Sequence, residues 1–168
     1  MKKCLLLAFL VVSVGAGRAS ALDWQRRAFP EDGFAVEFPP GNFQTTSPST
    51  STMMYLDRFV VGVRQHSLAV QSKHGAPITE PLDKYWSDFV ARLKSSEGKV
   101  TTAERTTFKG FPALRTAVTF PNGNVRDGMN VLMPKEGSLY ILSSMAGKSD
   151  PDVRDHFWNS FEYLPARK

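Results

Sequence analysis

The sequence predicts an α+β domain in which an antiparallel sheet is flanked by two main helices. Three observations lead to this fold class. Alternation of apolar and polar residues marks about seven to eight short strands. Two other stretches repeat their apolar residues at the helical spacing of three and four. The last four strands are joined by turns so short that only antiparallel neighbours can be connected by them.

The first two strands are expected on either side of a turn, "PEDG", at residues 30–33. Phe34, Val36 and Phe38 alternate with smaller or polar residues, and the prolines after residue 38 end that strand. Residues 44–52, "QTTSPSTST", are interpreted as a polar loop because they contain no apolar residue. Two further strands follow, near residues 53–61 and 62–73.

The first helix is expected over the segment "PLDKYWSDFVARLKSSEG", which begins at Pro81. Thr79 or Glu80 can cap it, Pro81 suits its first turn, and Gly98 ends it. An aromatic stripe of this kind could face a cofactor or a membrane, but packing on a sheet is the favoured interpretation. The apolar side chains share one face of the helix: Leu82, Tyr85, Trp86, Phe89, Val90 and Leu93.

Four strands of a meander follow, at residues 99–108, 111–120, 124–133 and 138–146. Lys109-Gly110 and Asn122-Gly123 mark the first two turns, and Asn-Gly is a strong hairpin signal because both residues tolerate positive φ. In the last strand both faces are apolar, which predicts a central position covered from both sides.

The second helix is expected to begin after Ser149 or Asp150, either of which can cap it, with Pro151 in its first turn. We expect Pro165 to end this helix. Its buried stripe would consist of four apolar residues spaced along one face: Val153, Phe157, Phe161 and Leu164.

In this order of elements the chain resembles the PsbP-like fold. The segments that carry the resemblance are "DGFAVEFP" (32–39), "FKGFPALRTAVTF" (108–120), and "SLYILSSMAG" (138–147) followed by "DVRDHFWNSFEYL" (152–164). That fold is shared by the extrinsic photosystem II subunit, Ran-binding Mog-type proteins and bacterial envelope DcrB-like proteins. The resemblance implies an α/β/α sandwich over residues 23–164. It also implies an accessory or binding role, without a shared catalytic machinery.

The N-terminal residues 1–21 predict a cleaved secretory signal peptide, followed by one domain over residues 22–168. Two lysines precede an apolar run from Cys4 to Val14, and Ala19 and Ala21 supply the small residues that a signal peptidase reads before Leu22. An uncleaved N-terminal anchor is the alternative. With cleavage we expect a periplasmic or secreted protein that is monomeric and has no transmembrane segment.

The net charge and the number of cysteines argue against several classes of function. Three of the 21 basic residues and none of the 16 acidic residues lie in the signal, which leaves a net charge of +2 on the rest. Such a mild, interspersed charge does not predict nucleic-acid binding. The only cysteine, Cys4, leaves with the signal, so neither a disulfide nor a cysteine zinc site is expected.

No catalytic motif is recognisable, and we expect no catalytic residue, metal or cofactor. Asp127 is the most unusual residue, since its charge lies on the apolar side of its strand. An ion pair with Arg115 or Arg126 is the simpler interpretation. The other interpretation is a ligand pocket, for which Asp127, Arg115 and His66 are the candidates.

The remaining histidines do not predict a metal site. His66 and His74 are eight residues apart on one strand, or about 26 Å if it is straight, so they cannot share an ion. An Asp152–His156 pair could form on the second helix.

These observations favour a non-enzymatic binding or accessory protein of the cell envelope, whose partner is an envelope protein or a small ligand. Two other hypotheses remain open. One is an envelope hydrolase whose active-site residues converge only in the folded chain. The other is a carrier for a small ligand or lipid, with a cleft between the sheet and one helix.

Overall fold

The computed structural model describes residues 22–95 and 98–164. The predicted signal, including Ala19 and Ala21, and the predicted helix end at Pro165 lie outside these residues. Leu22, the first residue expected after cleavage, is described and packs against the main core.

A seven-stranded antiparallel sheet is the centre of the fold, with the strand order β3-β4-β5-β9-β8-β7-β6. A separate three-stranded sheet has the order β1-β2-β10. The large sheet consists of β3 (Gln44–Ser49), β4 (Thr52–Val61), β5 (Arg64–His74), β6 (Lys99–Phe108), β7 (Phe111–Thr119), β8 (Val125–Met133) and β9 (Ser138–Ala146). The small sheet consists of β1 (Gln25–Phe29), β2 (Phe34–Phe38) and β10 (Glu162–Tyr163).

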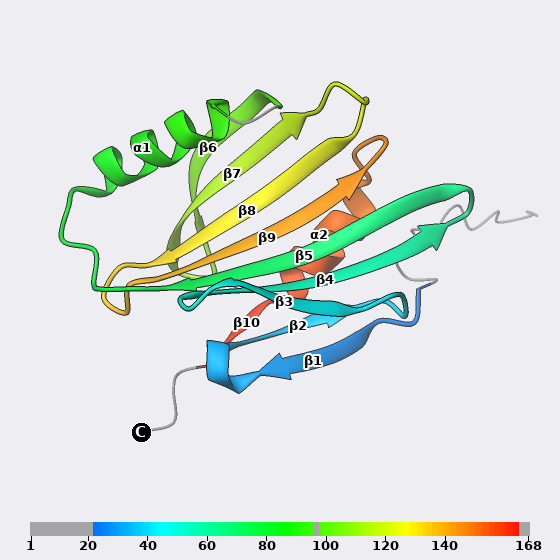
Figure 1. Ribbon diagram of the computed structural model, residues 1–168, viewed down its shortest axis with the longest axis horizontal. Coiled ribbons are helices and arrows are strands. Elements are labelled where there is room, and N and C mark those ends of the chain that lie inside the picture. The colour runs from blue at the N-terminus through cyan, green and yellow to red at the C-terminus, as the bar shows by residue number, and fades with distance from the viewer. Residues whose placement is uncertain (1–21, 96–97, 165–168) are drawn as a thin grey trace, which may run out of the picture.

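Two helices lie on opposite faces of the large sheet (Figure 1). The helix α1 (Leu82–Lys94) lies on one face, toward the β6 edge. The helix α2 (Pro151–Ser160) and the small sheet cover the other face. The α+β class with a seven-stranded antiparallel sheet between two main helices is therefore confirmed, as is the central place of β9, the fourth of the seven strands.

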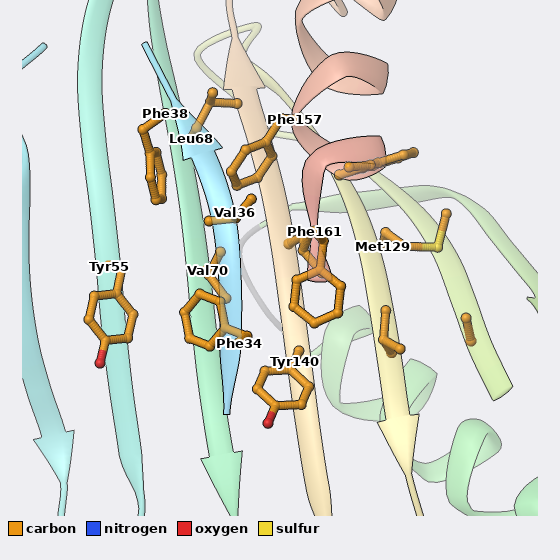
Figure 2. Close-up of a cluster of buried hydrophobic side chains, with 14 of the residues drawn as sticks. Phe34, Val36, Phe38, Tyr55, Leu68, Val70, Met129, Tyr140, Phe157 and Phe161 are labelled. Carbon is orange, nitrogen blue, oxygen red and sulfur yellow. The ribbon is translucent and has the colours of Figure 1, made fainter. Parts of the chain in front are cut away.

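The main core fills the layer between the large sheet, α2 and β2, and Figure 2 shows its centre. Phe34, Val36 and Phe38 of β2 are fully buried there, as their alternation predicts. Phe157 and Phe161 reach the same layer from the C-terminal segment and are also buried. This layer joins the beginning and the end of the described chain to the central strands.

A smaller second core lies under α1. Trp86 and Phe89 pack against Leu114, Leu132 and Leu139, which belong to β7, β8 and β9. The aromatic stripe of the first helix is therefore core, as favoured from its spacing. Because α1 covers only part of its face of the sheet, the rest of that face stays open to form a groove.

Two predicted segments differ from the structure. Residues 44–49 form the edge strand β3, although they were interpreted as a loop. Every residue of β3 is exposed, so the segment has no apolar alternation to reveal it, and an edge strand tolerates Pro48. The helix α2 ends at Ser160, because Glu162 and Tyr163 pair with β2 instead of continuing the helix.

The helix caps also differ in part from expectation. Pro81 occupies the N-cap position of α1, and neither Thr79 nor Glu80 caps the helix through its side chain. Asp150 caps α2, as one of the two predicted alternatives, by accepting a hydrogen bond from the backbone amide of Val153 at 3.4 Å.

Candidate functional site

A groove of about 450 Å³ lies between α1 and the part of the large sheet that α1 leaves uncovered. Ligand pockets for small molecules are typically of about 300–1,000 Å³. The groove is lined from β4, β5, β7, β8, β9 and α1 by Met54, Leu56, Ser67, Ala69, Gln71, Lys73, Phe89, Arg92, Leu93, Thr116, Arg126, Gly128, Asn130, Ile141, Ser143 and Met145.

The floor of the groove is a row of small residues that crosses four central strands. Ala69 of β5 is paired with Ser143 of β9, Ser143 with Gly128 of β8, and Gly128 with Thr116 of β7. A Cβ atom on Gly128 would lie 2.6 Å from the hydroxyl of Thr116, so this position has no room for a side chain. The groove is hollow because small side chains occupy the middle of the sheet.

Larger side chains form the two neighbouring rows and therefore the walls. On one side the register aligns Met145 with Arg126, and on the other it aligns Ile141 with Asn130. Asn130 is almost fully buried, and its amide donates to the carbonyl oxygen of Leu114 at 2.9 Å and to the hydroxyl of Thr116 at 3.2 Å. These bonds hold the polar wall in one orientation.

The charged residues of the groove are all basic. Lys73, Arg92 and Arg126 line it, and no Asp or Glu does. Within residues 22–95 and 98–164, none of the three forms an ion pair. Burial lowers the pKa of Arg126, whose guanidinium lies 5.3 Å from the ring centroid of Phe120. The groove thus combines apolar walls with a net positive charge along its lining.

Asp127, Arg115 and His66 point to the opposite face of the sheet and line no part of this groove. Asp127 accepts a hydrogen bond from Ser149 at 2.5 Å and lies 3.7 Å from Arg154 of α2. The predicted ion pair with Arg115 or Arg126 does not form. Arg126 follows Asp127 in the strand and so points to the other face, while Arg115 is paired with Met129.

His66 is buried, with its side chain 1 % exposed, and lines a cavity of about 240 Å³ that also includes Arg58 and Asn124. Its Nε2 lies 3.9 Å from Asp150, and neither ring nitrogen has a hydrogen-bond partner among the described residues. Burial lowers the pKa of His66, although the nearby carboxylate of Asp150 acts in the other direction.

Arg115 lines another cavity, of about 360 Å³, together with Met129 and Arg154. The three residues predicted as candidates therefore share a face of the sheet but not a cavity. Asp127 lines neither of these two cavities.

The Asp152–His156 pair does not form. The Nε2 atom of His156 lies 2.7 Å from Glu37 of β2, and its ring stacks on Trp24 with 4.1 Å between the centroids. Among residues 22–95 and 98–164 no three His, Cys, Asp or Glu side chains gather where a metal ion could bind.

A polar cluster around Asp32 was not anticipated from the sequence. Its carboxylate accepts hydrogen bonds from Tyr55 and, at 2.7 Å, from Ser72. His74 lies with Nε2 3.2 Å from the same carboxylate and with Nδ1 3.0 Å from the hydroxyl of Ser138. Sequence reasoning assigned Asp32 only to a turn, and nothing in that turn signals partners on β4, β5 and β9.

The order Asp32–His74–Ser138 resembles that of the triads of nucleophilic hydrolases, but the ring nitrogens are exchanged, since in those triads the serine contacts Nε2 and the carboxylate contacts Nδ1. Ser138, however, is only 7 % exposed and lines neither the groove nor the cavity beside His66. Tyr140 donates to the backbone carbonyl of Asp32 at 2.8 Å. The cluster therefore attaches the short 3-10 turn η2 (Pro30–Asp32) to the central strands.

No helix within the described residues combines the length and the apolar character that crossing a bilayer requires.

Solved structures similar to this chain share its fold. One is the cyanobacterial PsbP, CyanoP, from Synechocystis sp. PCC 6803, with a TM-score of 0.57 and 15% identity over 93% of this chain and 98% of that one. Another is the Ran-binding protein Mog1p of Saccharomyces cerevisiae, with a TM-score of 0.52 and 9% identity over 84% of this chain and 96% of that one. The protein therefore has the PsbP-like, Mog-type fold that its sequence resembles.

These identities show a common fold and nothing of a common activity. No protein-family model matches the sequence. No curated protein matches it either.

Proposed function

We propose that the protein is a non-catalytic binding protein of the cell envelope, exported by its N-terminal segment, and that it holds a small ligand in the groove beside α1. The observation that carries this proposal is the row of small residues across β5, β9, β8 and β7, which leaves the groove open in the centre of the sheet. A lining that is mostly apolar with a few polar groups is typical of ligand sites.

The exposed surface also favours a small ligand. Among the described residues only Val60, Val63 and Leu82 are large, hydrophobic and exposed, and none of them is aromatic. A flat aromatic patch would have favoured a protein partner. A protein partner stays compatible with the fold, since the similar Mog1p is a Ran-binding protein.

Filling the groove tests the proposal. Ala69 lies in the floor, and we expect Ala69→Trp to weaken binding of the uncharged dye Nile red by at least about tenfold, or about 1.4 kcal/mol. The measurement is a fluorescence titration. Ala28 lies on an exposed position of β1 in the small sheet, so Ala28→Trp is the matched control and should bind as the wild type does. Equal binding by Ala69→Trp, with unchanged circular dichroism, would remove the groove as the site.

The chain Asp32–His74–Ser138 is the one observation that favours the alternative of a hydrolase. Because Ser138 is buried away from the groove, we expect Ser138→Ala to hydrolyse p-nitrophenyl acetate at the wild-type rate, which should equal that of buffer. The exposed serine variant Ser51→Ala serves as the control. Turnover that Ser138→Ala abolishes and Ser51→Ala retains would show an enzyme instead.

A further inference from the structure

We propose that the ligand of the groove is a single-chain amphiphile with an anionic headgroup, an inference that rests on the proposed binding function. The apolar walls would hold the chain, and the arginines Arg92 and Arg126 would bind the headgroup.

The sign of the ligand charge follows from the charges that line the groove. Lys73, Arg92 and Arg126 contribute three positive charges, and no carboxylate lines the groove to offset them. The protein has formed ion pairs for other cations, such as Arg154 with Asp127 and Lys84 with Asp88. The groove cations form no ion pair among the described residues, although the charge of Arg92 contributes to lowering the pKa of Asp88 on the same helix. An anion in the groove would therefore meet a net positive charge.

The environment of Arg126 is the strongest argument for an anionic ligand. It is half-buried in the wall of the groove, and burial lowers its pKa because water no longer solvates the charged guanidinium fully. An anion bound beside it would offset this loss of solvation. A guanidinium also offers paired donors that fit the two oxygens of a carboxylate or phosphate.

The apolar part of the ligand follows from the remaining walls. Met54 and Leu56 project from β4, Ile141 projects from β9, and Phe89 projects from α1. Phe89 is already buried in the second core, but Met54, Leu56 and Ile141 are only half-buried. A purely polar anion would leave these three side chains in contact with water, whereas an alkyl chain would bury them. Methionine side chains adapt to chains of differing shape.

The register separates the charges along the groove. Arg126 lies in the row that contains Met145 and Ser67, and Lys73 is six residues further along β5, roughly 20 Å away in an extended strand. Lys73 is exposed, while Arg126 is half-buried. We therefore assign the headgroup to the half-buried Arg126 and not to Lys73, with the exposed Arg92 of α1 as the second cation of the site.

Competition between amphiphiles of one chain length tests the inference. Dodecanoate, dodecyl phosphate and dodecyltrimethylammonium would each be titrated, below micelle formation, against protein with bound Nile red. We expect at least one of the two anions to displace the dye at least about tenfold more effectively than the cation. The two anions distinguish a carboxylate headgroup from a phosphate headgroup.

The double variant Arg92→Gln/Arg126→Gln should lose this preference, measured as the ratio of anion to cation displacement within that variant. Arg64 and Lys135 are exposed and lie outside the groove, so Arg64→Gln/Lys135→Gln changes the net charge equally and should keep the preference. The single variant Arg92→Gln, on the surface of α1, provides a second test if the double variant does not fold. It should reduce the preference.

The outcomes separate the two proposals. Dye binding at the groove with equal displacement by anions and cation would overturn the anionic ligand and leave the binding function. A preference that both double variants lose equally would also overturn it, because net charge would then be the cause. Absence of binding by the dye and by every amphiphile would overturn both proposals.

Discussion

Asp32→Ala is expected to lower the free energy of unfolding by about 3 kcal/mol or more, although Asp32 lies in a turn of three residues. Its carboxylate is the acceptor for two buried hydroxyl groups, those of Tyr55 and Ser72. Alanine would leave both donors without this acceptor inside the protein, and hydrogen bonds to a charged group contribute about 1.5–3 kcal/mol each. Denaturation in urea, followed by tryptophan fluorescence, measures the loss.

Glu31 is the natural control because it is the neighbouring acid in the same turn and is exposed. Glu31→Ala should change stability by no more than about 0.5 kcal/mol. If the two alanine variants lose the same stability, the Asp32 cluster does not attach the turn to the sheet. Ser138 belongs to the same cluster but contacts His74 and not Asp32.

The second large effect is expected for Phe157→Ala, at about 3–5 kcal/mol. Phe157 is fully buried, and its ring centroid lies 5.4 Å from that of Phe38 in the layer between α2 and the small sheet. Removing the ring would leave a cavity among side chains that come from both ends of the described chain. The change in the cooperative unfolding transition, in urea or on heating, measures it.

Phe120→Ala deletes the same atoms from a half-buried residue just beyond β7 and should cost clearly less. Equal losses in the two variants would mean that the layer under α2 is not the main source of stability. Phe157 lies on the face of the sheet opposite the groove. We therefore expect folded Phe157→Ala to bind Nile red as the wild type does.

The two faces of the sheet therefore have different roles in the proposal. The face under α2 is covered by an extensive aromatic core, whereas the face under α1 has a small core and an open groove. Stability that is concentrated on one face permits small residues on the other, where they reduce packing but make room for a ligand.

Most of the elements could be predicted from local sequence because their signals are local. The stripe from Leu82 to Leu93 predicts α1, and Asn122-Gly123 predicts the turn between β7 and β8. The predictions were wrong for segments whose local sequence carries no periodic pattern of apolar residues. The strand β3 has no buried face, and Glu162–Tyr163 leave the helix only because β2 offers them a partner.

For the candidate site, too, local sequence predicted some features and tertiary packing determined the others. Asp127 could be recognised as unusual from its place in the strand, but its contacts with Ser149 and Arg154 depend on how α2 packs. No sequence pattern indicated the groove. Ala69, Thr116, Gly128 and Ser143 are ordinary small residues, scattered over 75 positions of the sequence.

The sequence by itself determined the antiparallel α+β class, the two helices, the meander and the prediction of an exported chain, because periodicity, turn residues and a signal segment act over a few neighbouring positions. Only the tertiary structure decided where the candidate site lies. Strand register brings Ala69, Ser143, Gly128 and Thr116 into one row with Arg126 in the next row, and no carboxylate lines this groove. Such a row depends on pairing between distant strands, and no local pattern encodes that pairing.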